Sequence, residues 1–349
     1  MTLSAAEDIA NDRPNRARGL RARLFGLVNI LIAVALALTP VTAILVLGWF
    51  MRIMRRETAI ALYRYGAPEK KRKLALTRLA AAPELSHIHQ FPGWWTGLVE
   101  TFRAGLKAAL ALAAATLPFG ALLLLSWWAG WENSFNKGYE QAWVGPLLAL
   151  LGLLLAIFVL VHLPMAMAHH AAERRIGALL ELRTVRQLIW RVPWRYMVFT
   201  LCVVAASAPV YLSQIVPTFI EGVFPELATA GPEEVRAFAL RWHVGFSVYL
   251  IVVLLFLRRW NARLYARAVL ANGGGGGEFT SLVLQSMELP RREENKPVGR
   301  LTRLVTSLIT AAAWFGFIAA LYVAQFANHA WWNWLNHPIL GLPWIFRPL

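Results

Sequence analysis

The stretch WVGPLLALLGLLLAIFVLVHLPMAMA, residues 143–168, decides the fold class of this chain. It has no charged side chain and exceeds the roughly 20 apolar residues that a helix needs to cross a bilayer. Four further runs of similar apolar character lie around it, at 102–129, 196–219, 242–257 and 304–327. Lipid offers backbone groups no hydrogen bonds, so each run is expected to be a helix. The sequence therefore predicts an all-α, polytopic membrane helix bundle with about five spanning helices.

The composition of the 349 residues agrees with this class. Hydrophobic residues make up 58% and charged residues 15%, against about 45–50% and about 25% in soluble domains. The net charge of +16 could suggest a nucleic-acid partner. The cations flank apolar runs, however, so we expect the lipid bilayer as partner and no nucleic acid. The single cysteine, Cys202, excludes an intramolecular disulfide and a cysteine-based metal cluster.

The connections between the runs alternate in charge. Those at 51–101, 169–195 and 258–303 are rich in Arg and Lys, whereas those at 130–142 and 220–241 hold more Glu than Arg and Lys. Positive loops stay on the cytoplasmic side of a membrane. We therefore predict a multi-pass protein of the bacterial cytoplasmic (inner) membrane, with basic loops in the cytoplasm and the C-terminal tail on the outer side.

The first apolar run, 24–50, conflicts with a simple crossing because both of its flanks are basic. Thr39-Pro40 lies near its middle, and proline disfavours helix at the preceding residue. Each half is then too short to span about 30 Å. We predict a re-entrant hairpin from the cytoplasmic side, with a single crossing (a sixth span) as the alternative.

These observations divide the chain into six parts. They are a cytoplasmic basic N-terminal arm (1–23), the re-entrant hairpin or first span (24–56), a basic cytoplasmic loop (57–101), a four-helix membrane core (102–257), a basic cytoplasmic loop with a Gly-rich linker (258–303), and the last span with a Trp-rich interfacial tail (304–349). In the basic loops, 69–81 is predicted to be a helix on the anionic leaflet, Gly273–Gly277 a flexible linker, and 279–289 an amphipathic turn or two. The tail from Trp331 is expected to lie flat in the outer interface.

No grouping of residues identifies a reaction. The chain has no Walker-type glycine loop, serine nucleophile motif or zinc motif, so we predict no catalytic residues, no metal site and no cofactor. His162 is the one candidate cofactor ligand, because an intramembrane histidine can serve as a proton relay or an axial ligand. Alternatively, it bonds the backbone carbonyl that Pro164, two residues on, leaves free. His169 and His170 are expected at the interface.

Basic and aromatic side chains at the ends of the runs are the candidates for contact with lipid headgroups or a partner. They are Arg52, Arg55, Arg56, Lys70, Lys71, Arg72, Lys73, Arg174, Arg175, Trp331, Trp332 and Trp334.

Three segments carry a family resemblance. They are 40–56, which includes Gly48-Trp49-Phe50 and Arg52-Ile53-Met54-Arg55; 91–107, which begins Phe91-Pro92-Gly93-Trp94-Trp95; and the basic, proline-containing 186–196, preceded by Leu163-Pro164. Over about residues 24 to 219 the chain resembles domain-of-unknown-function family 4013, a group of uncharacterised bacterial and archaeal polytopic membrane proteins. The resemblance implies the topology, including the hairpin, and implies no activity. The basic insert after Arg56 and the Trp-rich tail depart from the pattern.

The function predicted from these features is that of a membrane scaffold, or an accessory or assembly subunit, which binds other membrane proteins, a second copy or lipids and catalyses nothing itself. Small residues such as Ala108–Ala115 favour close helix packing. A transporter or channel is the first alternative, and a cavity lined by Asn29, Thr39, His162 or Gln214 would favour it. A haem- or pigment-binding membrane subunit, with His162 as ligand, is the second.

Overall fold

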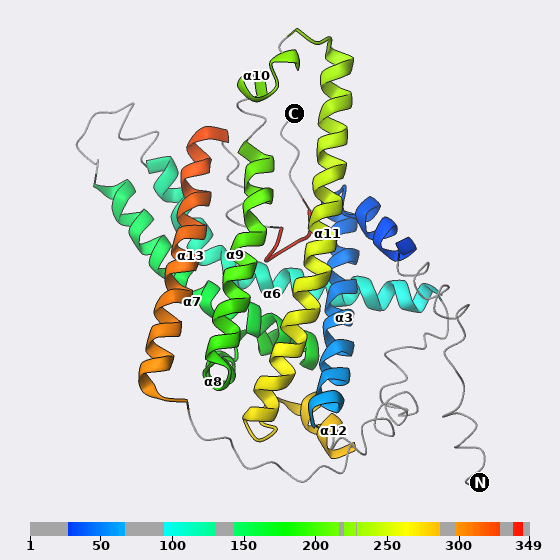
Figure 1. Cartoon of the computed structure of the whole chain (residues 1–349), viewed down its shortest axis with the longest axis vertical. Helices are drawn as coiled ribbons and strands as arrows, with labels where there is room; N and C mark the ends of the chain where they lie inside the picture. Colours follow the sequence, from blue (N-terminus) through cyan, green and yellow to red (C-terminus); the bar gives the residue numbers. More distant parts are fainter. Residues whose placement is uncertain are drawn as a thin grey trace.

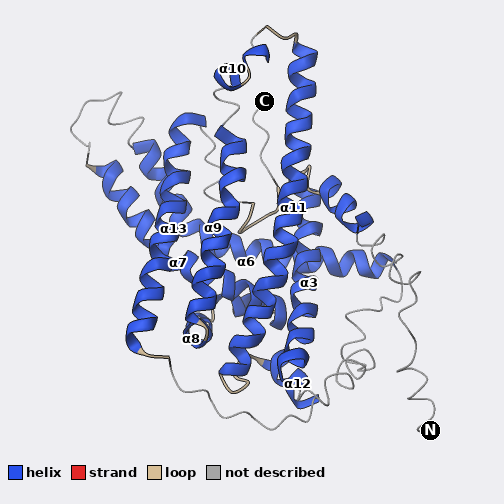
Figure 2. Cartoon of the chain, in the orientation of Figure 1, coloured by secondary structure: helices blue, strands red, loops and turns tan. Residues whose placement is uncertain are grey.

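A computed structural model describes residues 27–66, 94–129, 143–215, 220–227, 229–286, 298–328 and 338–344. All regular structure within these ranges is helical, and they contain no strand (Figure 2). The labelled elements are α3 (Pro40–Gly66), α6 (Trp94–Trp128), α7 (Val144–Glu173), η4 (Ile176–Leu180), α8 (Leu182–Arg191), α9 (Pro193–Ile215), α10 (Ile220–Val223), η6 (Pro225–Leu227), α11 (Pro232–Ala271), α12 (Glu278–Ser286) and α13 (Arg300–Asn328). The predicted all-α helix bundle is therefore confirmed.

Five of these helices are long and apolar enough to cross a membrane. They are Trp95–Trp128, Val144–Glu173, Pro193–Ser213, Pro232–Ala271 and Arg300–Val323. Each contains or closely overlaps one predicted run, so the five predicted spans are confirmed. Figure 1 shows α3, α9, α11 and α13 side by side along the long axis of the molecule. We call the end where α8 and α12 lie the basic end, and the end where α10 lies the far end.

The first apolar run breaks where the sequence predicts. A short apolar helix, Leu27–Leu36, is followed by a turn at 37–39, and α3 begins at Pro40. Proline suits the first helical position because its missing N–H would have no partner there. The Thr42 hydroxyl donates to the carbonyl of Leu36 and so satisfies a group that the short helix leaves unpaired at its end. The side of the membrane from which this hairpin inserts stays a prediction.

The basic loop predicted to begin at residue 57 begins later, because α3 continues as a buried helix to Gly66. Its last turns are tied to α11. Glu57 pairs with Arg263 at 3.2 Å and with Arg259 at 3.6 Å. Arg267 donates to the Tyr65 hydroxyl at 3.0 Å. The predicted start of the second basic loop, residue 258, is wrong for the same reason. Residues expected in the basic loops therefore lie in extensions of α3 and α11. Their charged side chains hold these two helices together.

The glycine run Gly273–Gly277 is packed against other elements and does not form the expected flexible linker. Gly273 and Gly274 have φ of 66° and 90°, which favour glycine. A Cβ on Gly277 would lie 2.3 Å from the Glu173 carboxylate. The run thus forms a close turn between α11 and α12, and α12 confirms the amphipathic turns predicted after it.

The C-terminal tail also differs from expectation. Residues 338–344 fold into the bundle, where Ile339 and Leu340 are 3% and 7% exposed. Figure 1 shows this red segment between α9 and α11. An outer interfacial position is therefore wrong for this part of the tail, whereas Trp331, Trp332 and Trp334 lie outside the described residues.

Helices α3 and α6 cross at two glycines. A Cβ added to Gly48 would lie 1.8 Å from the Thr101 carbonyl oxygen, and one added to Gly105 would lie 1.9 Å from the Ile44 carbonyl oxygen. Only glycine allows two helix backbones to approach this closely. In Figure 1 the first part of α6 runs across α3 and not along it. This crossing fixes where the next turns of both helices place their side chains.

Candidate anion-binding site

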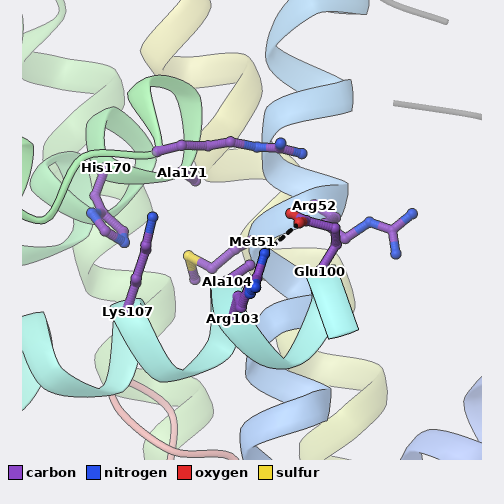
Figure 3. Close-up of a pocket in the computed structure, with 9 residues that line it drawn as sticks. Met51, Arg52, Glu100, Arg103, Ala104, Lys107, His170 and Ala171 are labelled. Carbon is purple, nitrogen blue, oxygen red and sulfur yellow. Dashed lines mark hydrogen bonds and ion pairs between the residues drawn. The ribbon is translucent and has the colours of Figure 1, made fainter. Parts of the chain in front are cut away.

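A small cavity opens next to this crossing, where α3, α6 and the end of α7 meet. Its volume is about 140 Å³. Its lining is basic and comes from three helices: Met51 and Arg52 of α3, Glu100, Arg103, Ala104 and Lys107 of α6, and His170, Ala171 and Arg174 at the end of α7. Figure 3 shows Arg103 and Lys107 extending from α6, with His170 beside Lys107, and shows Arg52 of α3 next to Glu100 with its guanidinium directed away from Lys107.

Helix periodicity brings the α6 residues together. Glu100, Arg103 and Lys107 are spaced i, i+3 and i+7, which places them on one face of a helix. The glycine crossing sets Arg52 one turn after Gly48, where its Nη1 donates to the Thr101 hydroxyl at 2.6 Å. The close crossing therefore anchors the α3 guanidinium against α6.

Arg174 reaches the cavity through an unusual backbone conformation. It caps α7 with φ 57° and ψ 17°, and it is the only non-glycine residue with positive φ in the described part of the chain. Its N–H donates to the His170 carbonyl. Glycine is the usual residue at such a cap, and a side chain there costs roughly 1–2 kcal/mol. The backbone strain thus falls on a residue that lines the cavity.

A hydrogen-bonded cluster clamps the turn that follows Arg174. His169 is fully buried; its Nε2–H donates to Glu181 at 2.8 Å, and its Nδ1 lies 2.9 Å from the Tyr265 hydroxyl. Arg175 pairs with the other oxygen of Glu181 at 2.8 Å. His169 was expected at the interface, but it is buried because the turn and α11 cover it. Its bonds hold the end of α7 against the segment that leads into α8.

His170 and Glu173 complete this support. The His170 Nδ1–H donates to the Arg175 carbonyl at 2.8 Å. A Glu173 oxygen accepts from the Phe279 N–H at 3.1 Å, at the start of α12. The cavity wall formed by the end of α7 is therefore fixed by contacts to α8, α11 and α12.

The electrostatic balance of the cavity is strongly positive. Arg52, Arg103, Lys107 and Arg174 face a single carboxylate, Glu100. Glu100 already pairs with Arg103 at 3.4 Å, in an exposed contact that contributes little energy.

The like charges are close enough to affect one another. Partial desolvation lowers the pKa of Arg52, and repulsion from Arg174 lowers it further. Desolvation also lowers the pKa of Arg174, while Glu100 opposes that change. Arginine stays protonated at neutral pH despite such shifts. The site therefore holds several cations that an anion would stabilise.

Guanidinium and ammonium groups converging on a small cavity fit the oxygens of a phosphate. They donate charge-assisted hydrogen bonds that are roughly twice as strong as neutral ones, and a guanidinium can bind two oxygens at once. The arrangement is suited to holding an anionic group at the end of the α7 span.

The residues predicted to contact lipid headgroups or a partner have different surroundings in the structure. Arg52 and Arg174 line the cavity. Arg175 turns to Glu181, and Arg55 lies over the Phe279 ring at 4.2 Å. Arg56 is exposed on α3. The lysine-rich run, Lys70, Lys71, Arg72 and Lys73, lies outside the described residues, as do the tail tryptophans.

His162 is separate from this cavity and lies partly exposed on α7. Its Nδ1–H donates to the Phe158 carbonyl at 2.8 Å, and its ring packs on Phe158. The bond is thus to a carbonyl of its own helix, as in the structural alternative, but not to the carbonyl four residues before Pro164 that the proline frees. In the described residues, no group of three or more His, Cys, Asp or Glu side chains could hold a metal ion.

Sequence reasoning missed Glu100, Arg103, Lys107 and His170 as neighbours. A signal was available in α6, because the i, i+3, i+7 spacing of its charges defines a polar face on an apolar helix. The other half of the site, on α3 and α7, depends on a crossing that no local pattern reveals.

No family model, curated protein or solved structure matches the chain. The resemblance to family 4013 has no support from these comparisons and stays a hypothesis.

Proposed function

We propose that this protein binds the headgroup of an anionic phospholipid in the α3–α6–α7 cavity and serves as a membrane scaffold or accessory subunit without catalysis of its own. The observation that carries the proposal is that four cationic residues, Arg52, Arg103, Lys107 and Arg174, line one small cavity together with a single carboxylate.

Exposed apolar side chains beside the cavity favour a lipid over a free phosphate. Phe102 and Leu106 of α6 are 40% and 38% exposed and neighbour Arg103 and Lys107 in the sequence. A phosphate in the cavity would leave the acyl chains to lie against this apolar surface. Free phosphate would gain the charge contacts and none of the apolar contact.

The membrane position fits the same ligand. The cavity lies where α7 ends and its charged turn begins, which is the level at which headgroups meet a spanning helix. With the basic end in the cytoplasm, as the charge distribution predicts, the lipid belongs to the inner leaflet of the bacterial inner membrane. Other membrane proteins, or a second copy, would contact the remaining apolar helix faces.

A lipid titration tests the proposal. The full chain is purified in mild detergent, and its melting temperature is followed while phosphatidylglycerol, phosphatidylcholine or inorganic phosphate is added. We expect phosphatidylglycerol to raise the melting temperature by several degrees through preferential binding to the folded state. Arg52→Gln and Arg174→Gln should each reduce this rise.

Arg236→Gln is the matched control, because Arg236 is exposed on α11 at the far end and pairs only superficially with Glu233. It should respond to phosphatidylglycerol as the unaltered chain does. Equal stabilisation of all variants, or of the unaltered chain by phosphatidylcholine, would reject the site. A full response to inorganic phosphate alone would assign the cavity to a free anion.

No observation favours the transport or pigment alternatives. Neither this cavity nor the aromatic groove along Phe238, Trp242 and Phe246 is lined by Asn29, Thr39 or His162. The Gln214 side chain lies outside the described residues.

A further inference from the structure

A buried arginine inside the bundle makes no contact with the residues that line the α3–α6–α7 cavity. Arg258 belongs to α11, is 5% exposed, and falls within a candidate membrane span. Among the described residues it pairs with no carboxylate. A buried charge in a span is costly, and where one occurs it usually belongs to a binding site. Arg258 therefore calls for a physical account.

The hydrogen bonds of Arg258 use its guanidinium unevenly. Nη1 contacts the Met167 sulfur at 3.0 Å. Nη2 donates to the carbonyl oxygens of Ile339 and Leu340, at 3.2 Å each. Nε is buried and has no partner in the described part of the chain. Nε and Nη2 form the edge of a guanidinium that binds a carboxylate through two parallel bonds. Of the two nitrogens at that edge, Nη2 is hydrogen-bonded and Nε has no partner in the described part of the chain.

The groups on Nη2 are weak ligands for a cation. Both are neutral backbone carbonyls, and they come from the segment 338–344, whose buried side chains Ile339 and Leu340 pack into the core. A carboxylate would satisfy Nε as well as Nη2 and would neutralise the charge. Such a pair is strong where water is excluded, provided both oxygens are bonded.

We propose that Arg258 forms a carboxylate-binding site within the bundle and that the segment 338–344 closes this site with its backbone carbonyls. The ligand class is a small carboxylate, bound through Nε and Nη2 when the segment withdraws. The proposal is independent of the lipid cavity, with which it shares no residue.

Charge-selective cysteine labelling tests it in the full chain. Met167→Cys is made in a Cys202→Ala background, so that the only thiol lies beside Arg258. Its modification is timed with an anionic sulfonatoethyl and a cationic trimethylammonioethyl methanethiosulfonate. Ile339→Gly with Leu340→Gly then removes the apolar anchors of the segment and leaves its backbone in place.

We expect the loosened chain to react faster with both reagents than the anchored chain. The anionic reagent should be favoured by about tenfold, because a cation in a low-dielectric site concentrates anions. Acetate should slow the anionic reagent. Arg258→Gln should abolish both the charge preference and the acetate protection. Arg258→Lys should keep the preference but lose most of the protection, since it lacks the two-pronged edge.

Helix content and elution as a single species establish that each variant is folded. Labelling that is unchanged by loosening would show that the segment does not close the site. Equal rates for the two reagents, or no protection by acetate, would overturn the assignment of a carboxylate ligand.

Discussion

At the residue scale, Arg174 shows most clearly that the α3–α6–α7 cavity has a structural cost. Its backbone takes the left-handed conformation that glycine prefers, and its guanidinium lines the cavity. If stability alone governed this position, glycine would serve better. The strain is consistent with a residue retained for binding, since stability and function often compete at such positions.

Arg174→Gly separates the two contributions. Relief of the strained cap should stabilise the protein by about 1 kcal/mol, seen as a higher melting temperature without lipid. The loss of one cation should weaken the stabilisation by phosphatidylglycerol. Arg174→Ala keeps the strain and should show the same weakened lipid effect without the gain in stability. A lower melting temperature for Arg174→Gly would contradict this account.

Glu181 supplies a prediction on pH. The hydrogen bond from His169 lowers the pKa of Glu181, and Arg175 lowers it further. Folding therefore stabilises the ionised form of Glu181 relative to its protonated form. That stabilisation is fully present above its ordinary pKa of 4.5 and is lost as the pH falls through the lowered pKa.

Glu181→Gln should therefore destabilise the protein at neutral pH by about 1–3 kcal/mol, because it weakens the bond to a buried histidine. The difference between the two proteins should shrink below about pH 4.5. Melting curves between pH 3.5 and pH 7.5 measure it, on the order of a few degrees. A difference that grows at acid pH would contradict the assignment.

At the element scale, the apolar pattern of the sequence predicts the spanning helices, whereas contacts between distant residues determine how far α3 and α11 extend beyond their apolar parts. The five spans and the break at Thr39-Pro40 were predictable because hydrophobic length and proline chemistry act locally. The extension of α3 to Gly66 was not, because the contact that holds its last turns joins Glu57 to Arg263 of α11, 206 residues later in the sequence. The buried position of residues 338–344 depends in the same way on Arg258.

One missed element had a local signal. Helix α8 buries Val185, Leu188 and Ile189, whereas Arg183 and Arg186 lie on its other face. That spacing is typical of an amphipathic helix. The lipid cavity combines both situations, since the polar face of α6 could be predicted from the sequence, and the approach of Arg52 and Arg174 could not.

The glycine crossing of α3 and α6 is the most sensitive packing contact that supports the cavity. Gly48→Ala would force a Cβ against the Thr101 carbonyl. We expect a loss of about 2 kcal/mol or more from overpacking, together with weaker lipid stabilisation because Arg52 moves with α3. Gly316→Ala in α13 is the control: it meets nothing within 4 Å and should be neutral or stabilising by up to about 1 kcal/mol. Thermal unfolding of both variants measures these changes in stability, and a loss in Gly48→Ala no larger than that in Gly316→Ala would contradict the role of the crossing.

At the scale of the whole molecule, we propose that the apolar helix faces and the cations of the α3–α6–α7 cavity bind the same lipid. The spans leave large apolar side chains exposed along their length, such as Leu110, Leu150 and Phe256. Some arginines, such as Arg263 and Arg267, join α11 to α3, whereas others line the α3–α6–α7 cavity. Net charge alone therefore overstates how many cations are free to bind an anionic membrane.

Salt dependence distinguishes a built cavity from a diffuse basic surface. Exposed charges are largely screened at high ionic strength, whereas partly buried contacts are screened much less. Stabilisation by phosphatidylglycerol should therefore persist at about 0.5 M salt in the unaltered chain, measured by melting temperature. Complete loss of the effect there would favour a diffuse surface.

Native mass spectrometry of the full chain, extracted with its membrane lipids, measures directly whether the cavity holds an anionic phospholipid. We expect the unaltered protein and Arg236→Gln each to retain one anionic phospholipid under conditions that strip zwitterionic lipid. The double variant Arg52→Gln/Arg174→Gln should lose it. Equal retention by the double variant, or no retained phospholipid on the unaltered chain, would contradict the account.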